Sequence, residues 1–83
     1  MDGEQIRAAR MLLGITAQDL AEMAGVSVPT MQRMDSARGT ASGRHETVEK
    51  VRTALEAQGI QFLDEGDTSR GRGVALKREG LAE

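Results

Sequence analysis

Few residues in this 83-residue chain could carry out covalent or metal chemistry. The sequence has one histidine, His45, and no cysteine. A thiol nucleophile, a disulfide framework and a cysteine-ligated zinc site are therefore excluded. A single histidine with no neighbouring ligand is better explained as a polar surface residue at the start of a helix. We expect no metal, no cofactor and no enzymatic activity.

The chemistry that remains is binding through charged and polar groups. Between residues 27 and 44 the chain has Arg33, Arg38 and Arg44 against one acidic residue, Asp35, whereas acidic residues outnumber arginines in residues 1–26. The net charge is −2, so no global basic field attracts a polyanion. The local excess of arginine is sufficient for a short contact with nucleic acid and indicates few phosphate contacts per chain.

Capping signals and apolar periodicity predict the elements that must position these side chains. Helices are expected at about residues 4–13, 16–25, 28–35 and 44–58, with Asp2, Thr16 and Ser27 as N-caps of the first three. After Gly59 the pattern changes to alternation, which predicts short strands at residues 60–63 and 73–77. The expected fold is mainly α, a small bundle of four helices with a C-terminal two-stranded β extension.

The organisation predicted from this pattern is a helical domain at residues 1–58 followed by a β extension at residues 59–83. The chain is short enough for a single small domain. No stretch approaches the roughly 18 apolar residues of a membrane span, and the N-terminus has no signal-peptide layout. We expect a soluble protein of the cytoplasm, associated with the nucleoid.

Residues 16–35 (TAQDLAEMAGVSVPTMQRMD) have the residue types and spacing of a helix-turn-helix motif. Ala21 is small where two helices must cross closely, and Gly25 stands where a tight turn requires a positive φ. The apolar positions that hold the pair together are Leu20, Val26, Met31 and Met34. The alternative is an ordinary helical hairpin in a small bundle.

The chain resembles the Cro/C1-type (Xre-like) helix-turn-helix regulators of phages and bacteria, whose domain is lambda-repressor-like. The match covers residues 6–58 and is carried by the string IRAARMLLGITAQDLAEMAGVSVPTMQRMDSARG. The tail GIQFLDEG…RGVALKR resembles an extension found on short alphaproteobacterial members. The resemblance implies a third helix that enters the major groove, usually in a dimer on a palindromic site. The sequence departs from the family pattern at Ala17, Val28 and Ala37.

The resemblance assigns roles to the exposed part of the third helix and its surroundings. The expected base contacts are Val28, Pro29, Gln32 and Arg33. Arg33 can bind guanine O6 and N7 with two hydrogen bonds, whereas Val28 and Pro29 offer apolar contact to thymine methyl groups. The expected phosphate contacts are Gln18, Ser27, Thr30, Arg38 and Arg44. Arg10 and Asp35 occupy positions that form a structural ion pair in the family.

The predicted strands each place apolar side chains on one face. Ile60, Phe62, Val74 and Leu76 alternate with other residues and must be buried. Packing against the first and fourth helices of the same chain is one solution. Pairing with the strands of a second chain is the other, and we favour it because it also satisfies open strand edges. We therefore predict a homodimer held chiefly by residues 60–77.

Two functions are compatible with this reading. The first is a sequence-specific transcriptional regulator that binds double-stranded DNA. The second is an antitoxin-like protein that uses the same fold for DNA autoregulation and for binding a toxin. The alternating pattern of the tail favours the first, because a toxin-binding tail is usually a disordered segment that folds on its partner.

Overall fold

The computed structural model describes residues 1–37, 44–64, 66 and 71–77. Over these residues the chain forms helices α1 (Gly3–Leu13), α2 (Ala17–Ala24), α3 (Val28–Ser36) and α4 (His45–Ala57), then strands β1 (Ile60–Leu63) and β2 (Gly73–Leu76). The predicted fold class, four helices with a C-terminal two-stranded extension, is confirmed. None of the described helices has the length and apolar character needed to cross a bilayer.

The helices begin where the capping signals place them. Asp2 accepts a hydrogen bond from the backbone N–H of Gln5 at 2.8 Å, and the Gln5 side chain accepts one from the backbone N–H of Asp2 at 2.9 Å. Thr16 and Asp19 form the same reciprocal pair at the start of α2, with both distances 3.0 Å. Ser27 caps α3. These bonds satisfy N–H groups that the first turn of a helix leaves without intrahelical partners.

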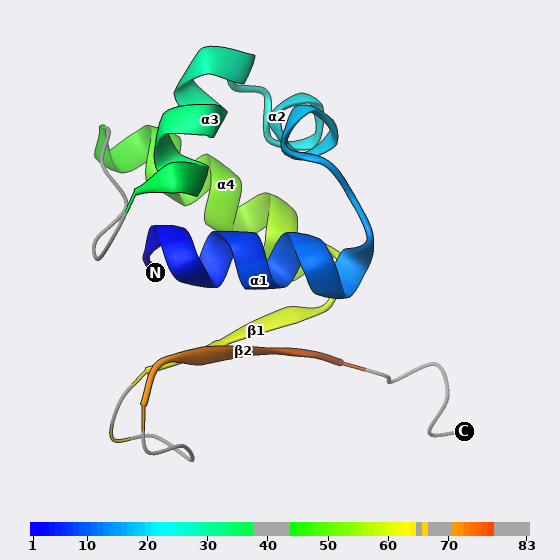
Figure 1. Cartoon of the computed structure of the whole chain (residues 1–83), viewed down its shortest axis with the longest axis vertical. Coiled ribbons are helices and arrows are strands. Elements are labelled where there is room, and N and C mark those ends of the chain that lie inside the picture. Colours follow the sequence, from blue (N-terminus) through cyan, green and yellow to red (C-terminus); the bar gives the residue numbers. More distant parts are fainter. Residues whose placement is uncertain (38–43, 65, 67–70, 78–83) are drawn as a thin grey trace.

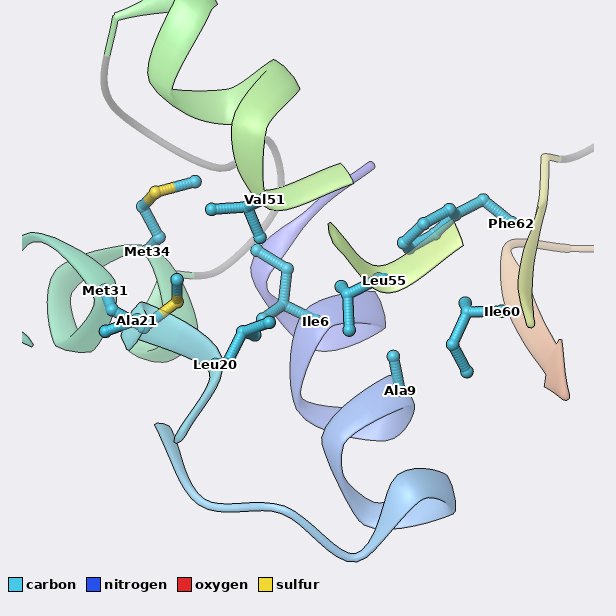
Figure 2. Close-up of a cluster of buried hydrophobic side chains, with 10 residues drawn as sticks. All are labelled: Ile6, Ala9, Leu20, Ala21, Met31, Met34, Val51, Leu55, Ile60 and Phe62. Atoms are coloured by element: carbon cyan, nitrogen blue, oxygen red, sulfur yellow. The ribbon is translucent and has the colours of Figure 1, made fainter. Parts of the chain in front are cut away.

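The core lies between the four helices and extends to β1, and Figure 2 shows its side chains in one cluster, from Met31 and Met34 of α3 to Ile60 and Phe62 of β1. Each helix supplies two buried hydrophobic residues and β1 supplies two more. They are Ile6, Ala9, Leu20, Ala21, Met31, Met34, Val51, Leu55, Ile60 and Phe62. Because one aromatic ring is available, aliphatic and methionine side chains fill most of this space.

The two strands pair with each other in antiparallel register, with Ile60 opposite Leu76 and Phe62 opposite Val74. These four side chains share one face of the hairpin, which packs against α1 and α4 of the same chain. The hairpin lies on the opposite side of α1 from α2 and α3 (Figure 1). The residue 58/59 boundary is therefore a change of secondary structure within one hydrophobic core. Residues 78–83 of the predicted extension lie outside the described residues.

A buried glutamine joins the hairpin to the first turn of α1. The side-chain Nε2 of Gln5, which is 3% exposed, donates to the carbonyl oxygens of Leu63 at 3.1 Å and Gly73 at 2.9 Å. Arg72 adds an ion pair to the carboxylate of Asp2 at 2.6 Å. The first turn of α1 therefore binds the ends of both strands through polar contacts.

The same turn lies against the end of α3 at Gly3. A Cβ atom at residue 3 would stand 2.8 Å from the carbonyl oxygen of Met34 and closer still to that of Ala37. Both atoms belong to the backbone, so neither can move aside cheaply. Glycine at this position lets the two helices approach each other.

We predict that Gly3→Ala destabilises the protein by about 1–3 kcal/mol, because the added methyl group forces α1 away from α3. The loss should appear in urea unfolding even though alanine favours helix more than glycine does. Gly71→Ala is the matched control, since a Cβ there meets no atom within 4 Å. A Gly3→Ala protein as stable as the wild type would contradict the close contact.

The capping pair of α2 predicts a pH dependence of stability. Hydrogen bonds from the backbone N–H of Thr16 and then from its hydroxyl lower the pKa of Asp19 below its ordinary value. A pKa that is lower in the folded state stabilises the protein fully above the unfolded pKa, near pH 4, and this contribution disappears as the pH falls through the folded pKa. The stability difference between wild type and Asp19→Ala, measured by urea unfolding, should therefore shrink below about pH 4. A difference that stays constant down to about pH 2 would contradict this.

Candidate nucleic-acid interface

Helices α2 and α3 form a unit joined by the three residues 25–27. Gly25 has a φ of 72°, in the region that favours glycine, as the sequence predicted. The N–H of Val26 donates to the carbonyl oxygen of Ala21 at 3.0 Å and closes the turn. Ala21 is 1% exposed where the helices cross. The geometry is that of a helix-turn-helix.

Helix α3 has one face in the core and one in solvent. Met31 and Met34 are buried. Pro29, Gln32 and Arg33, three of the four residues predicted to contact bases, are exposed. The fourth, Val28, is half-buried and packs against the core cluster. Most of the predicted reading surface is therefore accessible, and Val28 offers only part of its side chain.

A polar stripe runs along the N-terminal half of α3. The hydroxyl of Thr30 accepts hydrogen bonds from Ser27 Oγ at 2.8 Å and from Arg33 Nη2 at 3.2 Å. These residues are three apart, which places them on one side of the helix. The structure thus brings Arg33, the predicted guanine contact, together with Ser27 and Thr30, two of the predicted phosphate contacts.

The other predicted phosphate contacts are distributed over neighbouring segments. Gln18 is exposed at the second position of α2. Arg44 is exposed directly before α4, and its side chain makes no capping hydrogen bond. Both residues stand at helix N-termini, whose free N–H groups favour anions. Arg38 lies outside the described residues.

The ion pair implied for Arg10 and Asp35 is present. Arg10 Nε lies 2.6 Å from one oxygen of the Asp35 carboxylate, and Nη2 lies 3.0 Å from the other. A third donor of the same guanidinium binds the carbonyl oxygen of Ile15 at 3.2 Å. The side chains are 18% and 14% exposed, so water screens the pair only partly. This contact ties α1 to the last turn of α3.

Sequence reasoning missed a second arginine at the same place. Arg7, one turn before Arg10 on α1, donates to the backbone carbonyl oxygens of Asp35 and, at 3.4 Å, Ala37. The signal available in the sequence was the absence of a glycine at the end of α3, where Ala37 stands. A helix that ends without glycine needs donors from elsewhere for its last carbonyl groups.

The residues predicted to hold a dimer divide into two pairs. Ile60 and Phe62 are 2% and 9% exposed because they face α1 and α4 of their own chain. Val74 and Leu76 are half-buried and keep accessible surface. Packing within one chain therefore covers Ile60 and Phe62 almost completely and Val74 and Leu76 in part.

A scan of the sequence against models of protein families gives no match, and a search of curated proteins finds no relative of significant similarity. The geometry of α2 and α3, with the chemistry of their exposed side chains, is the basis for a functional assignment.

We predict that Asp35→Asn destabilises the protein by about 1–3 kcal/mol, because it leaves the Arg10 guanidinium partly buried without a counter-charge. A double-mutant cycle with Arg10→Met, read by urea unfolding, should give a coupling of about 0.5–3 kcal/mol, since the second substitution removes the unpaired charge. Additive losses in the two single variants would show that the contact contributes nothing.

Proposed function

We propose that this protein is a sequence-specific DNA-binding regulator of transcription that inserts α3 into the major groove of double-stranded DNA. The observation that carries the proposal is that α3 is anchored at its C-terminal end while the face that carries Pro29, Gln32 and Arg33 is exposed. Arg7 and Arg10 bind the last turn, whereas Pro29, Gln32 and Arg33 face solvent. The resemblance to Cro/C1-type regulators supports the same assignment.

The dimensions of α3 support this mode of binding. A helix of nine residues is about 14 Å long. The major groove is about 12 Å wide, which accommodates one helix with its side chains. In Figure 1 α3 lies on the opposite side of α1 from the hairpin, so the strands do not cover it.

Arg33 is the residue that we assign to base recognition. It is exposed, and among the residues that the structure describes its guanidinium donates a hydrogen bond to Thr30 alone, one turn earlier. Its guanidinium can exchange this bond for two bonds to guanine, a contact worth about 1–3 kcal/mol of discrimination. Gln32 adds an amide suited to adenine, and Pro29 adds apolar contact to a thymine methyl group.

We assign the remaining contacts to the phosphate backbone, where they fix the orientation of the protein on the duplex without reading its sequence. The residues are Gln18, Ser27, Thr30, Arg38 and Arg44. So few contacts predict modest affinity for one chain. A homodimer supplies two reading helices for half-sites about 34 Å apart. We place the dimer interface at the hairpin, through the surface of Val74 and Leu76 that remains accessible. We place the protein in the cytoplasm, bound to the nucleoid.

The proposal is tested by selecting the DNA that the purified full-length chain retains from a randomised library. We expect an enriched palindromic sequence with two half-sites. Sedimentation of the complex should show two chains per site. Recovery of random sequences only, at low salt, would contradict sequence-specific regulation.

We predict that Arg33→Ala and Arg44→Ala affect DNA binding differently. Arg33→Ala should lower the affinity for the selected site by about tenfold or more and leave random DNA unaffected, because a base contact is lost. Arg44→Ala should weaken binding to both and reduce the salt dependence, because a phosphate contact is lost. Fluorescence anisotropy at several salt concentrations distinguishes the two. If Arg33→Ala leaves the ratio of the affinities for the selected site and for random DNA unchanged, Arg33 does not read bases.

A further inference from the structure

The C-terminal end of α3 differs from those of α1 and α2. Helices α1 and α2 each end in a glycine with positive φ, Gly14 and Gly25, whose N–H donates back to carbonyl groups of the last turn. At the end of α3, Ala37 has extended backbone, with φ −67° and ψ 147°, and its N–H reaches only Met34 at 3.3 Å. The Ser36 hydroxyl donates to the carbonyl oxygens of Gln32 at 2.8 Å and Arg33 at 3.4 Å, whereas the carbonyl oxygen of Asp35 takes its donor from outside the helix.

Arg7 supplies that donor from α1. Its guanidinium binds the carbonyl oxygens of Asp35 and Ala37, and the side chain is half-buried between the two helices. Its positive charge also lies at the negative end of the α3 dipole, where a cation is stabilising. Gly3 brings the backbone of α1 close to the carbonyl groups of Met34 and Ala37, at the same end of α3.

We propose that Arg7 is a positioning residue for sequence recognition: by capping α3 from outside, it fixes the direction in which the helix presents Arg33 and Gln32. This inference rests on the proposed function, because it concerns the helix that would enter the groove. Arg7 itself would touch no base. It acts through the backbone at the C-terminal end of α3.

The contact of Arg7 differs in kind from that of its neighbour Arg10. Arg10 binds the carboxylate of Asp35, a side chain that can rotate while the helix axis moves. Arg7 binds main-chain oxygens, that of Asp35 in the last turn and that of Ala37 directly after the helix, and these atoms move with the backbone of α3. Arg7 therefore restrains the tilt of α3 more directly than the ion pair does.

A small change of tilt is enough to affect recognition. For a helix about 14 Å long that is held at its C-terminal end, a rotation of ~10° moves the N-terminal end, where Pro29 lies, by ~2 Å. Gln32 and Arg33 lie nearer the anchored end and their backbone moves less, but the length of their side chains adds to the displacement of the groups that would contact bases. Hydrogen bonds to base edges tolerate displacements of only about 0.5 Å. Contacts to phosphates made by flexible arginines outside α3 tolerate more. Loss of the restraint should therefore reduce discrimination between sequences more than it reduces general affinity.

The test compares Arg7→Met with Arg7→Lys and with a control on another helix, Arg52→Met. Methionine keeps an apolar stem and removes all donors, whereas lysine keeps a charge that can bind one carbonyl oxygen. Arg52 binds Glu56 at 3.2 Å and lies 5.4 Å from the ring centre of Phe62, so its loss destabilises the core side of α4 without removing a contact to α3. Affinities for the selected site and for a scrambled duplex are measured at several salt concentrations, together with thermal stability.

We expect Arg7→Met to reduce the ratio of the two affinities by about tenfold, with unchanged affinity and salt dependence on scrambled DNA. Arg7→Lys should recover part of the ratio. Arg52→Met should lower the thermal stability and leave the ratio unchanged. An equal loss on both duplexes with a weaker salt dependence would identify Arg7 as a phosphate contact and overturn the proposal. The proposal is also overturned if Arg52→Met reduces the ratio of the two affinities as much as Arg7→Met does.

Amide hydrogen exchange separates this inference from the proposed function. In Arg7→Met we expect faster exchange in the last turn of α3 and unchanged exchange in α2, whether or not DNA is present. If the wild-type chain selects no DNA sequence and exchange in α3 still rises, the proposed function fails and Arg7 remains the cap of α3. If exchange in α3 is unchanged, Arg7 does not position the helix.

Discussion

The attachment of the last turn of α3 to α1 is the constraint on which the arrangement of the helices depends. Carbonyl groups at the end of a helix lose their intrahelical partners, and leaving them buried without donors costs about 1–3 kcal/mol each. Here α1 provides the donors through Arg7, provides a counter-charge for Asp35 through Arg10, and allows close approach at Gly3. Three features of one helix thus determine where a second helix ends.

Helix α1 serves the hairpin in the same way from its other side. Gln5 and Asp2 bind the strand ends by side-chain contacts, and the apolar face of the hairpin packs on α1 and α4 (Figure 1). A two-stranded hairpin is marginal in water by itself, so its order depends on these contacts. Because α1 touches both α3 and the hairpin, the stability of the strands and the placement of α3 are linked through one rigid element.

The parts of the structure that the sequence predicts are those determined by neighbouring residues. The caps at Asp2 and Thr16 and the turn at Gly25 depend on residues within about four positions, and all three were predicted. The contacts that the sequence does not reveal join residues far apart, such as Gln5 with Leu63 and Gly73, or Arg7 with Ala37. Their polar groups have many possible partners in the chain, and only the packed fold selects among them. The pair of Arg10 and Asp35 was an exception, since a family resemblance supplied it.

The hydrogen bonding of Arg33 shows why the exposed face of α3 is suited to an anionic partner. Its guanidinium donates a hydrogen bond of 3.2 Å to the hydroxyl of Thr30, one turn earlier on the exposed face of the helix. The hydrogen bond to a hydroxyl that also accepts from Ser27 is exposed to water and holds Arg33 weakly. Electronegative acceptors on a guanine edge or a phosphate would offer this cation stronger hydrogen bonds. The anchored end of α3 therefore has strong, partly buried ionic contacts, whereas its exposed face carries polar groups that exchange partners at little cost.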